Sequence, residues 1–378
     1  MNPRLVKSDR LKITYLSSAK LPSRFANSIQ VMKMCQAFAV NGHEVHLLAQ
    51  KYEGLATNIH KYYGVDECFD ITLSKRPDVR IIGAIIYAIN LRRESKNIVD
   101  TDIYYGRNIY ALVAVSYKNI PLIFEAHTPP QNFVQKYIEG WLFQRRVFKN
   151  LVVISMALKY EYMRIYPFLS DEKIIVAHDG ADLPQESSDS HILKLNSTGR
   201  MCVGYIGHLY KGKGVEIVVQ LAKKIPDMDF HVVGGTESDI AYWSSKSKLK
   251  NLVFHGFVPH SDLGRYFDCF DVVLAPYQYT VTVGGGEGDV ARWMSPLKIF
   301  EYMAHGKAIV SSDLPVLKEV FEGGMNSLLC KPDNLKEWED ALYKLRTEPD
   351  LRLQIGLCAK EHFLAKYTWK KRAELVLS

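Results

Sequence analysis

Short runs of β-branched and aromatic residues alternate with helical patterns along the whole chain, and this alternation is the strongest constraint on its fold. In the first half, we expect strands at 12–17, 44–49, 71–73, 102–107, 122–127 and 150–157. In the second half, we expect them at 201–207, 230–234, 252–257, 272–277, 308–312 and 327–330. Strands separated by helices pair in parallel, so each half is predicted to form one doubly wound parallel sheet of the α/β class.

The length of 378 residues exceeds that of a typical single core, so we expect two domains. A stretch rich in serine and aspartate, LPQESSDSHILKLNSTGR at 183–200, lies between the two halves and has the composition of a linker. We therefore predict one domain over residues 1–190 and a second domain over residues 191–365.

The composition is that of an ordinary globular protein, with 47% hydrophobic and 24% charged residues. The N-terminus lacks the apolar core of a signal peptide, and the apolar run at 81–91 is too short to span a bilayer. Six cysteines are scattered without metal-binding spacing, which argues against zinc and against a disulfide framework. These features favour a cytoplasmic protein, and we expect no nucleic acid partner.

The net charge of +7 includes a basic and aromatic stretch, KYIEGWLFQRRVFKN at 136–150. Its aromatic and basic side chains are those of Trp141, Phe143, Phe148, Arg145, Arg146 and Lys149. Such a stretch can rest on an anionic membrane surface. An ordinary amphipathic helix with a solvated basic face also explains it, and we favour that second interpretation.

Sheets of this kind bind ligands in the loops beyond the carboxyl ends of their strands. The candidate loops of the first half are 24–30, with Asn27 and Ser28, and 125–130, with His127. The candidate loops of the second half are 207–214, 256–263 and 277–298. Two facing sets of such loops would form a cleft between the domains.

The loop GHLYKGKG at 207–214 follows a predicted strand and opens a predicted helix. Its glycines allow a phosphate to approach the backbone, and Lys211 and Lys213 add positive charge to a helix start that favours anions. Gly207 to Lys213 also fits the GxxxxGK part of a Walker A motif, but Gly214 stands where that motif has Ser or Thr. The loop is therefore either a phosphate site or a glycine-rich turn.

A second helix start lies in SPLKIFEYMAHGK at 295–307, where Ser295 is a suitable N-cap and Pro296 a suitable first helical residue. Lys298 is repelled by the positive end of the helix dipole unless an anion binds there. A surface ion pair between Lys298 and Glu301 is the simpler alternative. If both helix starts bind anions, a nucleoside diphosphate fits them, and Glu301 can accept hydrogen bonds from its ribose.

Three linked motifs of the second half resemble the donor-binding half of glycosyltransferase family four, retaining enzymes of the GT-B fold. These motifs are Gly207-His208-Leu209 with Lys213-Gly214, HGFVPHSDLGRYFDCFDVVLAPY at 255–277, and SPLKIFEYMAHGKAIVSSDLPVLKEV at 295–320. The first half resembles the family more loosely, through its opening strand, FANSIQVMKMCQAFAVNGHEV and EAHTP. YTWKKRAELVL resembles the C-terminal helix that crosses back onto the N-terminal domain.

This resemblance implies two Rossmann-like domains that face each other across a cleft. The domain over 1–190, with the crossover helix at about 366–378, would bind the acceptor, and the domain over 191–365 would bind the donor. Transfer of a hexosyl group from a nucleotide sugar, most often a UDP-sugar such as UDP-glucose, is the implied reaction. The anomeric configuration would be retained without a covalent carboxylate nucleophile.

By position, the resemblance implies that Lys213 binds the donor diphosphate. His208 stands where the family usually has arginine, so Lys211 is a candidate for the missing cation. Leu297 and Lys298, at the helix start with Ser295 and Pro296, match the backbone amides at the diphosphate. The base is usually held by main chain at the position of Val258, close to Leu263, and His127 matches a histidine that faces the reacting sugar.

Glu301 matches the second acid of the family's Glu-x7-Glu pair, which holds the ribose. The first acid would fall at Trp293, so the usual contact from that carboxylate to the donor sugar has no counterpart there. The candidates for a replacement are the carboxylate of Glu287 and the backbone of Gly284, Gly285 and Gly286. The identity of the donor sugar is correspondingly open.

We expect no metal or other cofactor. The chain has two Asp-x-Asp triplets, which hold a divalent ion in another transferase fold, at Asp100–Asp102 and at Asp227–Asp229. Both triplets precede predicted strands, far from the carboxyl ends where ligands gather, and we interpret both as chance.

The acceptor is expected to be a polysaccharide or a lipid-linked glycan precursor, made at the inner face of the membrane. A P-loop nucleotidase built on 207–214 is one alternative. A nucleotide-sugar-binding protein without turnover, or an epimerase or phosphorylase of the same fold, is another.

Overall fold

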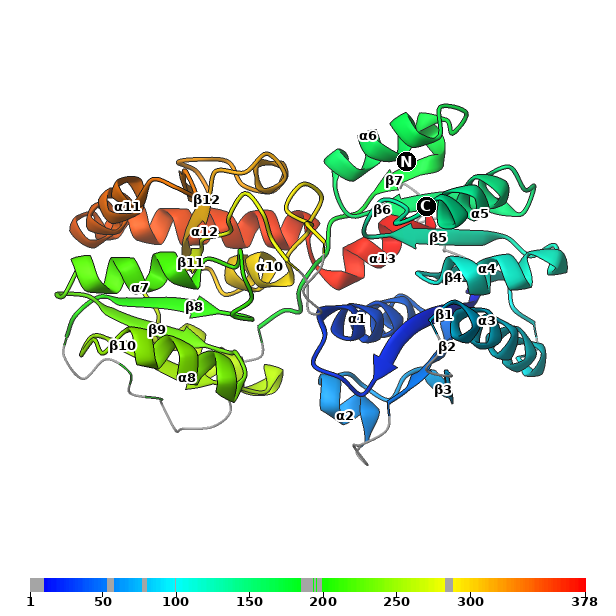
Figure 1. The fold of residues 1–378 in the computed structure, drawn as a ribbon, viewed down its shortest axis with the longest axis horizontal. Helices are drawn as coiled ribbons and strands as arrows, with labels where there is room; N and C mark the ends of the chain where they lie inside the picture. The colour runs from blue at the N-terminus through cyan, green and yellow to red at the C-terminus, as the bar shows by residue number, and fades with distance from the viewer. Residues whose placement is uncertain are drawn as a thin grey trace, which may run out of the picture. The chain divides into compact units, whose positions relative to one another are not determined.

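The computed structural model describes residues 10–52, 58–76, 80–98, 100–184, 193, 195, 199–282 and 288–378, and Figure 1 shows the fold. The chain forms two compact units. The first unit consists of Met1–Ile154, Leu158–Ala177 and Trp369–Ser378, and the second of Ser155–Ala157 and His178–Thr368. The chain therefore changes units at His178, ahead of the predicted boundary at 190.

The first unit is built on a seven-stranded sheet with the order β3-β2-β1-β4-β5-β6-β7, in which all pairs are parallel. The strands are β1 (Lys12–Leu21), β2 (Glu44–Lys51), β3 (Asp70–Ser74), β4 (Ile103–Gly106), β5 (Leu122–Ala126), β6 (Phe148–Val153) and β7 (Ile174–Val176). The six predicted strands are present. The seventh, β7, was missed because three residues at a sheet edge are too few to show a pattern.

Helices cover both faces of this sheet (Figure 1). They are α1 (Ala26–Val40), α2 (Ile59–Tyr63), α3 (Arg80–Asn97), α4 (Ile109–Val115), α5 (Phe133–Phe143), α6 (Met156–Ile165) and α13 (Trp369–Leu377). The last helix, α13, packs against α1, which itself packs against β1 and β2. The predicted strand at 150–157 was too long, because α6 already begins at Met156.

The second unit is built on a six-stranded parallel sheet with the order β10-β9-β8-β11-β12-β13. The strands are β8 (Cys202–Ile206), β9 (Asp229–Val233), β10 (Leu252–Gly256), β11 (Val272–Ala275), β12 (Ala308–Ser312) and β13 (Leu328–Cys330). All six predicted strands of this half are present. Both sheets therefore have the doubly wound order that the alternating pattern predicts.

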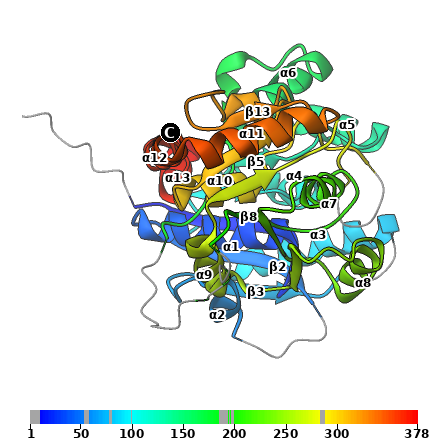
Figure 2. The same ribbon diagram turned by 90° about the vertical axis from the view of Figure 1, so that its left-hand side faces the viewer.

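Helices cover both faces of the second sheet (Figure 1 and Figure 2). The helices are α7 (Val215–Lys224), α8 (Glu237–Lys246), α9 (Leu263–Cys269), α10 (Leu297–Ala304), α11 (Leu335–Thr347) and α12 (Pro349–Lys366). An apolar cluster lies on each face, and α12 contributes to both clusters. Leu221 of α7 and Trp338 of α11 belong to one cluster. Phe267 of α9, Phe300 of α10 and Phe363 of α12 belong to the other.

The basic and aromatic stretch at 136–150 does not form one surface. Phe143 and Phe148 are buried, and their rings pack together with centroids 4.8 Å apart. Trp141 is exposed on α5, where the guanidinium of Arg145 lies 5.0 Å from its ring centre. The expectation that all three aromatic side chains could meet a membrane is therefore wrong for Phe143 and Phe148.

The apolar run at 81–91 lies within α3. Among the described residues, no helix combines the length and the apolar character needed to cross a bilayer.

Candidate functional site

The loops of the second unit meet where β8 and β11 end. In the order β9-β8-β11, the winding of the sheet reverses between β8 and β11, and this switch point is where α/β sheets bind ligands. Gly207 directly follows β8, and a Cβ built on it would lie 3.6 Å from Cδ of Lys298 on α10. The two helix-start motifs of the sequence therefore lie side by side.

Gly212 and Gly214 are required by packing within the protein. Their φ angles are 86° and 85°, in the left-handed region that favours glycine. A Cβ on Gly214 would lie 1.8 Å from the carbonyl oxygen of Pro276, and one on Gly212 would lie 2.0 Å from that of Thr280. The glycine-rich turn is therefore sufficient to explain these two residues, and a phosphate is not needed for it.

The side chain of Lys298 is buried without a hydrogen-bond partner for its Nζ among the described residues. Nζ lies 4.0 Å from the ring centre of Tyr205 and 4.4 Å from that of Tyr277. Burial, reinforced by the charge of Lys213, lowers the pKa of Lys298 well below its ordinary value. The alternative of a surface ion pair with Glu301 is wrong, because Lys298 is only 8% exposed.

Helix α10 begins one residue later than predicted. Pro296 occupies the N-cap position with an extended backbone, and Leu297 and Lys298 are the first two helical residues. Ser295 does not cap the helix, because its hydroxyl accepts a hydrogen bond of 2.8 Å from the backbone N–H of Asp179. The first N–H groups of a helix have no partner within the helix, so this end of α10 remains suited to an anion.

Lys213 shares one aromatic ring with Lys298. Its Nζ lies 5.2 Å from the ring centre of Tyr277, and burial lowers its pKa to about 8. Lys211 is exposed, and its carbonyl oxygen accepts a hydrogen bond from the N–H of Thr282. Two lysines of reduced pKa, Lys213 and Lys298, therefore lie at the switch point.

His208 belongs to the same glycine-rich loop as Lys213. Its ring stacks on that of Tyr210 with centroids 4.8 Å apart, and its carbonyl oxygen accepts a hydrogen bond from the hydroxyl of Tyr205. Burial, followed by the charge of Lys213, lowers the pKa of His208, so the ring is neutral near pH 7. His208 therefore supplies at most one hydrogen-bond donor and no positive charge at neutral pH.

Glu301 lies one turn after Lys298 on α10 and is half-buried. Its Oε1 is 3.6 Å from Nδ1 of His260. Val258 and Leu263 are also half-buried and pack against the apolar cluster beneath α10. Glu301, which is matched to the ribose, therefore lies on α10 itself. Val258 and Leu263, which are matched to the base, pack against the apolar cluster to which α10 belongs.

Trp293 stands where the family has the first acid, and it is half-buried. The guanidinium carbon of Arg292 lies 4.9 Å from the centre of the Trp293 ring. The candidate replacements for that acid are Glu287 and the backbone of Gly284, Gly285 and Gly286, and all of them lie outside the described residues.

The candidate residues of the first unit have different surroundings. Asn27 is exposed in the first turn of α1. Ser28 is buried, where its hydroxyl lies 2.7 Å from Oγ of Ser23 and donates to the carbonyl oxygen of Lys20 at 3.1 Å. Ser28 therefore ties the loop before α1 to the end of β1, whereas Asn27 is accessible to a ligand.

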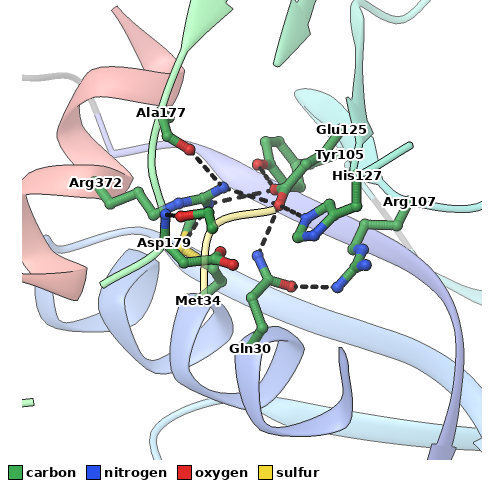
Figure 3. A network of polar contacts seen from close by, with 10 residues as sticks. Gln30, Met34, Tyr105, Arg107, Glu125, His127, Ala177, Asp179 and Arg372 are labelled. Carbon is green, nitrogen blue, oxygen red and sulfur yellow. Dashed lines mark hydrogen bonds and ion pairs between the residues drawn. The ribbon is translucent and has the colours of Figure 1, made fainter. Parts of the chain in front are cut away.

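His127 follows β5 and is joined to a network of polar residues (Figure 3). Its Nε2 lies 2.6 Å from Oε1 of Glu125, and the same oxygen lies 2.9 Å from the guanidinium of Arg372 on α13. The sequence singled out His127 but none of these partners.

Four residues of the two sites were missed by the sequence analysis: Tyr205, Tyr277, Glu125 and Arg372. Tyr205 lies in the predicted strand 201–207 and Tyr277 opens the candidate loop 277–298, but neither residue was singled out, and both are fully buried. Glu125 gave a usable signal, because it is a lone acid within the apolar strand LIFEA. Arg372 gave none, because its partner is 247 residues away in the chain.

Both Asp-x-Asp triplets lie at amino-terminal ends of strands, as predicted. Asp102 directly precedes β4 and accepts a hydrogen bond of 2.7 Å from the backbone N–H of Lys12. Asp229 is the first residue of β9, and Asp227 pairs with Arg346. Neither triplet is at a carboxyl end of a strand, where the loops of these sheets bind ligands.

Two family models match the sequence, one for each half of the chain. The model described as "Glycosyltransferase Family 4" matches residues 28–185, and the model described as "Glycosyl transferases group 1" matches residues 200–348. The chain belongs to glycosyltransferase family 4. In this family 4 protein, the second match contains both helix starts together with Lys213 and Lys298.

Similar solved structures identify the fold of this chain. HepE of Anabaena, solved in complex with UDP, superposes with a TM-score of 0.73 at 16% identity, over 97% of this chain and 98% of that one. Sucrose-phosphate synthase of Thermosynechococcus elongatus superposes with a TM-score of 0.72 at 16% identity, over 97% of each chain. The predicted GT-B fold with two Rossmann-like parallel sheets is therefore confirmed.

A curated relative is an uncharacterized glycosyltransferase of Haemophilus influenzae, 27% identical over 202 residues. The match covers 50% of this chain and 50% of the relative, so the chain spans about half the length of the curated relative it matches.

Proposed function

We propose that this chain transfers a hexosyl group from a UDP-sugar, such as UDP-glucose, to a hydroxyl of a polysaccharide or lipid-linked glycan precursor. The observation that carries the proposal is the buried ammonium of Lys298, held between two tyrosine rings beside Lys213 at the switch point. Membership in glycosyltransferase family 4 supports glycosyl transfer. The complexes of HepE with UDP and with UDP-glucose support the choice of donor.

Burial of the charged Lys298 side chain carries an energetic cost that a bound diphosphate would offset. A buried ammonium without a hydrogen-bonded counter-ion is expensive, on the order of several kcal/mol before it gives up its proton. Tyrosine faces recover part of this cost through cation–π attraction. A diphosphate bound at the start of α10 would supply both the missing acceptor and the missing charge, and its two phosphates can meet Lys213 and Lys298.

The same groups suit the chemistry of glycosyl transfer. In the transition state, the sugar ring becomes positive while the departing diphosphate gains negative charge, so preorganised donors at that diphosphate lower the barrier. We assign this role to Lys213, Lys298 and the N–H groups of Leu297 and Lys298, with the neutral ring of His208 as a further donor. The transfer is proposed to retain the anomeric configuration, with the leaving phosphate oxygen assisting the incoming hydroxyl.

Further contacts complete the proposed donor site. Glu301 would accept hydrogen bonds from the ribose, and the backbone at Val258, with Leu263 beside it, would hold the base. Asn27 and His127 of the first unit are proposed to act on the acceptor and on the transferred sugar. Since fixed lysines would neutralise the diphosphate, we propose that no divalent metal is needed, and turnover that is lost in EDTA would contradict this.

A thermal-shift screen with UDP-, GDP- and ADP-sugars tests the donor assignment, because a ligand raises stability in proportion to its binding free energy. UDP-sugars are expected to raise the unfolding temperature of the native protein, and Lys298→Met is expected to abolish the shift. The control is Lys223→Met, which changes an exposed lysine of α7 and should leave the shift intact.

The same screen separates the alternatives. A shift with ATP and rapid phosphate release would identify a nucleotidase. Binding of UDP-sugars with neither slow hydrolysis nor transfer, over many acceptors, would identify a binding protein without turnover. Product analysis would reveal an epimerase or a phosphorylase.

The acceptor proposal rests on the exposed side of α5. Phe133, Tyr137 and Trp141 are exposed at helical spacing, and together with Phe168 they line a groove of about 560 Å³. Lys136 and Arg145 also line this groove. Aromatic side chains bordered by basic ones suit the interfacial region of an anionic membrane. We propose that this groove docks on the inner face of a membrane that carries the lipid-linked acceptor.

Sedimentation with vesicles of anionic lipid tests this part separately. We expect binding that weakens at high salt and that is reduced by replacing Phe133, Tyr137 and Trp141 with serine. The control is Tyr242→Ser, which removes an exposed aromatic side chain from α8. Absence of sedimentation at low salt would contradict membrane docking while leaving the donor assignment intact.

A further inference from the structure

Two buried tyrosine rings of the second unit lie against the ammonium group of Lys298. Tyr205 belongs to β8, and Tyr277 belongs to the loop after β11. Only 0% and 1% of their surfaces are exposed, so neither ring offers a face on which a base or a sugar could stack. The two rings therefore act on the side chains that they contact inside the protein.

Both tyrosines are neutral phenols. Burial raises the pKa of each hydroxyl well above the ordinary tyrosine value, so neither side chain can be a phenolate counter-ion near pH 7. A neutral ring still attracts an ammonium group through its negative face, and this attraction is stronger where water is excluded. The contacts of Lys298 with Tyr205 and Tyr277 are therefore cation–π contacts.

Tyr277 serves two cations. Its ring centre lies 4.4 Å from Nζ of Lys298 and 5.2 Å from Nζ of Lys213, and both distances are within the reach of about 6 Å for such contacts. After burial, the charge of Lys213 is the next cause that lowers the pKa of Lys298. One ring thus stabilises two ammonium groups, one of which is weakened by the charge of the other.

The neighbouring charges show why ring faces suit this place. Among the described residues, the opposing charge of Glu301 raises the pKa of Lys298, but it ranks below burial and Lys213. His208 also faces both lysines and is neutral near pH 7. A carboxylate bonded to Lys298 would keep it charged but would also repel a phosphate. A ring carries no net charge, so the lysine keeps its full attraction for an anion.

Each tyrosine is anchored by a hydrogen bond of its own. The hydroxyl of Tyr205 donates to the carbonyl oxygen of His208 at 2.7 Å, which ties β8 to the glycine-rich loop. The carbonyl oxygen of Tyr277 accepts from Oγ of Ser312 on β12 at 2.6 Å. The fold itself therefore fixes both rings, and a ligand is not needed to bring them to the lysines.

We propose that Tyr205 and Tyr277 are positioning residues of the donor site. Their ring faces hold Lys298, and the ring of Tyr277 also holds Lys213, as two cations that remain available to the two phosphates of a diphosphate. The inference rests on the proposed function and adds the two tyrosines to it. It also assigns a selectivity, because a diphosphate can pair with both lysines whereas a monophosphate can pair with only one.

A change of the ring at position 277 that preserves its shape tests the proposal. Tyr277→Phe keeps the ring face, and its affinity for UDP is expected to stay within about 2-fold of the native value. A trifluorinated phenylalanine in place of Tyr277 has a similar shape but a much weaker negative face. It is expected to weaken UDP binding by about 10-fold and UMP binding by about 3-fold, measured by calorimetry. Equal affinities of the two variants for UDP, or equal losses for UDP and UMP, would overturn the proposal.

The control places the same trifluorinated residue at Phe230, a fully buried ring of β9 in the same unit. The ratio of the UDP affinity to the UMP affinity should stay at its native value in this variant. Thermal unfolding of each variant shows that it is folded. A fall of the ratio at position 230 as large as that at position 277 would show that fluorination acts through general packing, and the assignment would then be wrong.

A second readout needs no ligand. In protein labelled with ¹³C at lysine, the signal of Lys213, assigned by its absence from Lys213→Gln, should titrate near its pKa of about 8. The trifluorinated ring at position 277 should lower this pKa, because the native ring favours the charged lysine, whereas Tyr277→Phe should leave it unchanged.

This titration also separates the inference from the proposed function. The same pKa of Lys213 with the native and the trifluorinated ring would overturn the inference. A lowered pKa in a protein that binds neither UDP nor any UDP-sugar would support the ring contacts and would refute the proposed function alone.

Discussion

At the scale of single residues, Lys213 and Lys298 link nucleotide binding to pH. Burial lowers the pKa of Lys213 to about 8 and that of Lys298 well below its ordinary value. A diphosphate binds the charged form of each lysine better, so binding raises both pKa values and takes up protons. Affinity for the donor therefore depends on pH in a range where exposed lysines do not titrate.

We expect the affinity for UDP-glucose to fall as the pH rises from 7 to 9, with a bend near the pKa of Lys213 at about 8. Titration calorimetry in buffers of different ionisation enthalpy should detect the proton uptake. Lys213→Gln should weaken binding and remove the bend, whereas Lys223→Gln, at an exposed position on α7, should preserve it. An affinity that is constant over this range would contradict the proposed contact.

In the free protein, the free energy of unfolding should change with pH in the opposite direction from the affinity for the donor. A lysine whose pKa is lowered by folding binds fewer protons in the folded state than in the unfolded state. The free energy of unfolding of the second unit should therefore rise with pH between the folded pKa of Lys213, about 8, and the usual lysine value of about 10.4.

At the scale of elements, the start of α7 depends on close packing between two loops. Gly214 occupies its N-cap position with a left-handed φ, directly against the carbonyl oxygen of Pro276. The loop after β11 carries Tyr277, whose ring lies beside both lysines. The geometry of the proposed diphosphate site therefore depends on a glycine that does not itself need to touch the ligand.

Gly214→Ala is expected to destabilise the second unit by about 3 kcal/mol or more, because backbone strain adds to a clash that cannot relax. Gly324→Ala is a matched control in the same unit. Its φ of 82° is similar, but a Cβ would meet no atom within 4 Å, so only the strain of about 1–2 kcal/mol applies. Urea unfolding of both variants provides the comparison, and equal losses would show that the contact with Pro276 has no energetic weight.

At the scale of the whole molecule, the chain leaves the first unit at His178 and returns to it at Trp369. Each unit has its own sheet, and the candidate nucleotide residues all lie in the second. Arg372, which follows this return, supplies a counter-ion to a strand of the first unit. The first unit is therefore completed only after the second unit has been synthesised.

Hydrogen exchange measured by mass spectrometry should locate the effect of UDP within the full chain. We expect increased protection in 207–214, 256–263 and 295–301, because bound backbone groups open less often. The same segments in Lys298→Met should show no change with UDP. Protection confined to segments of the first unit would contradict the assignment of the donor site.

The sequence by itself determined the two parallel sheets and the loops that carry the site. Strand and helix patterns are local, since each is encoded within a window of a few residues, and the carboxyl ends of parallel strands follow from them. This is why the strands of both halves and the meeting of 207–214 with 295–301 could be predicted. The motifs of the second half also sufficed to recognise the family.

Only the tertiary structure decided which polar groups are buried together. The sequence left Lys298 open between an anion-binding helix start and a surface pair with Glu301, and only the packing of Tyr205 and Tyr277 from two other elements shows that it is buried. Likewise, the start of α10 moved by one residue because Ser295 bonds a distant backbone N–H. Glu125 and Arg372 are 247 residues apart, and no local pattern encodes such a pair. Burial and charge pairing depend on which segments pack together, and these two properties set the pKa values of the site.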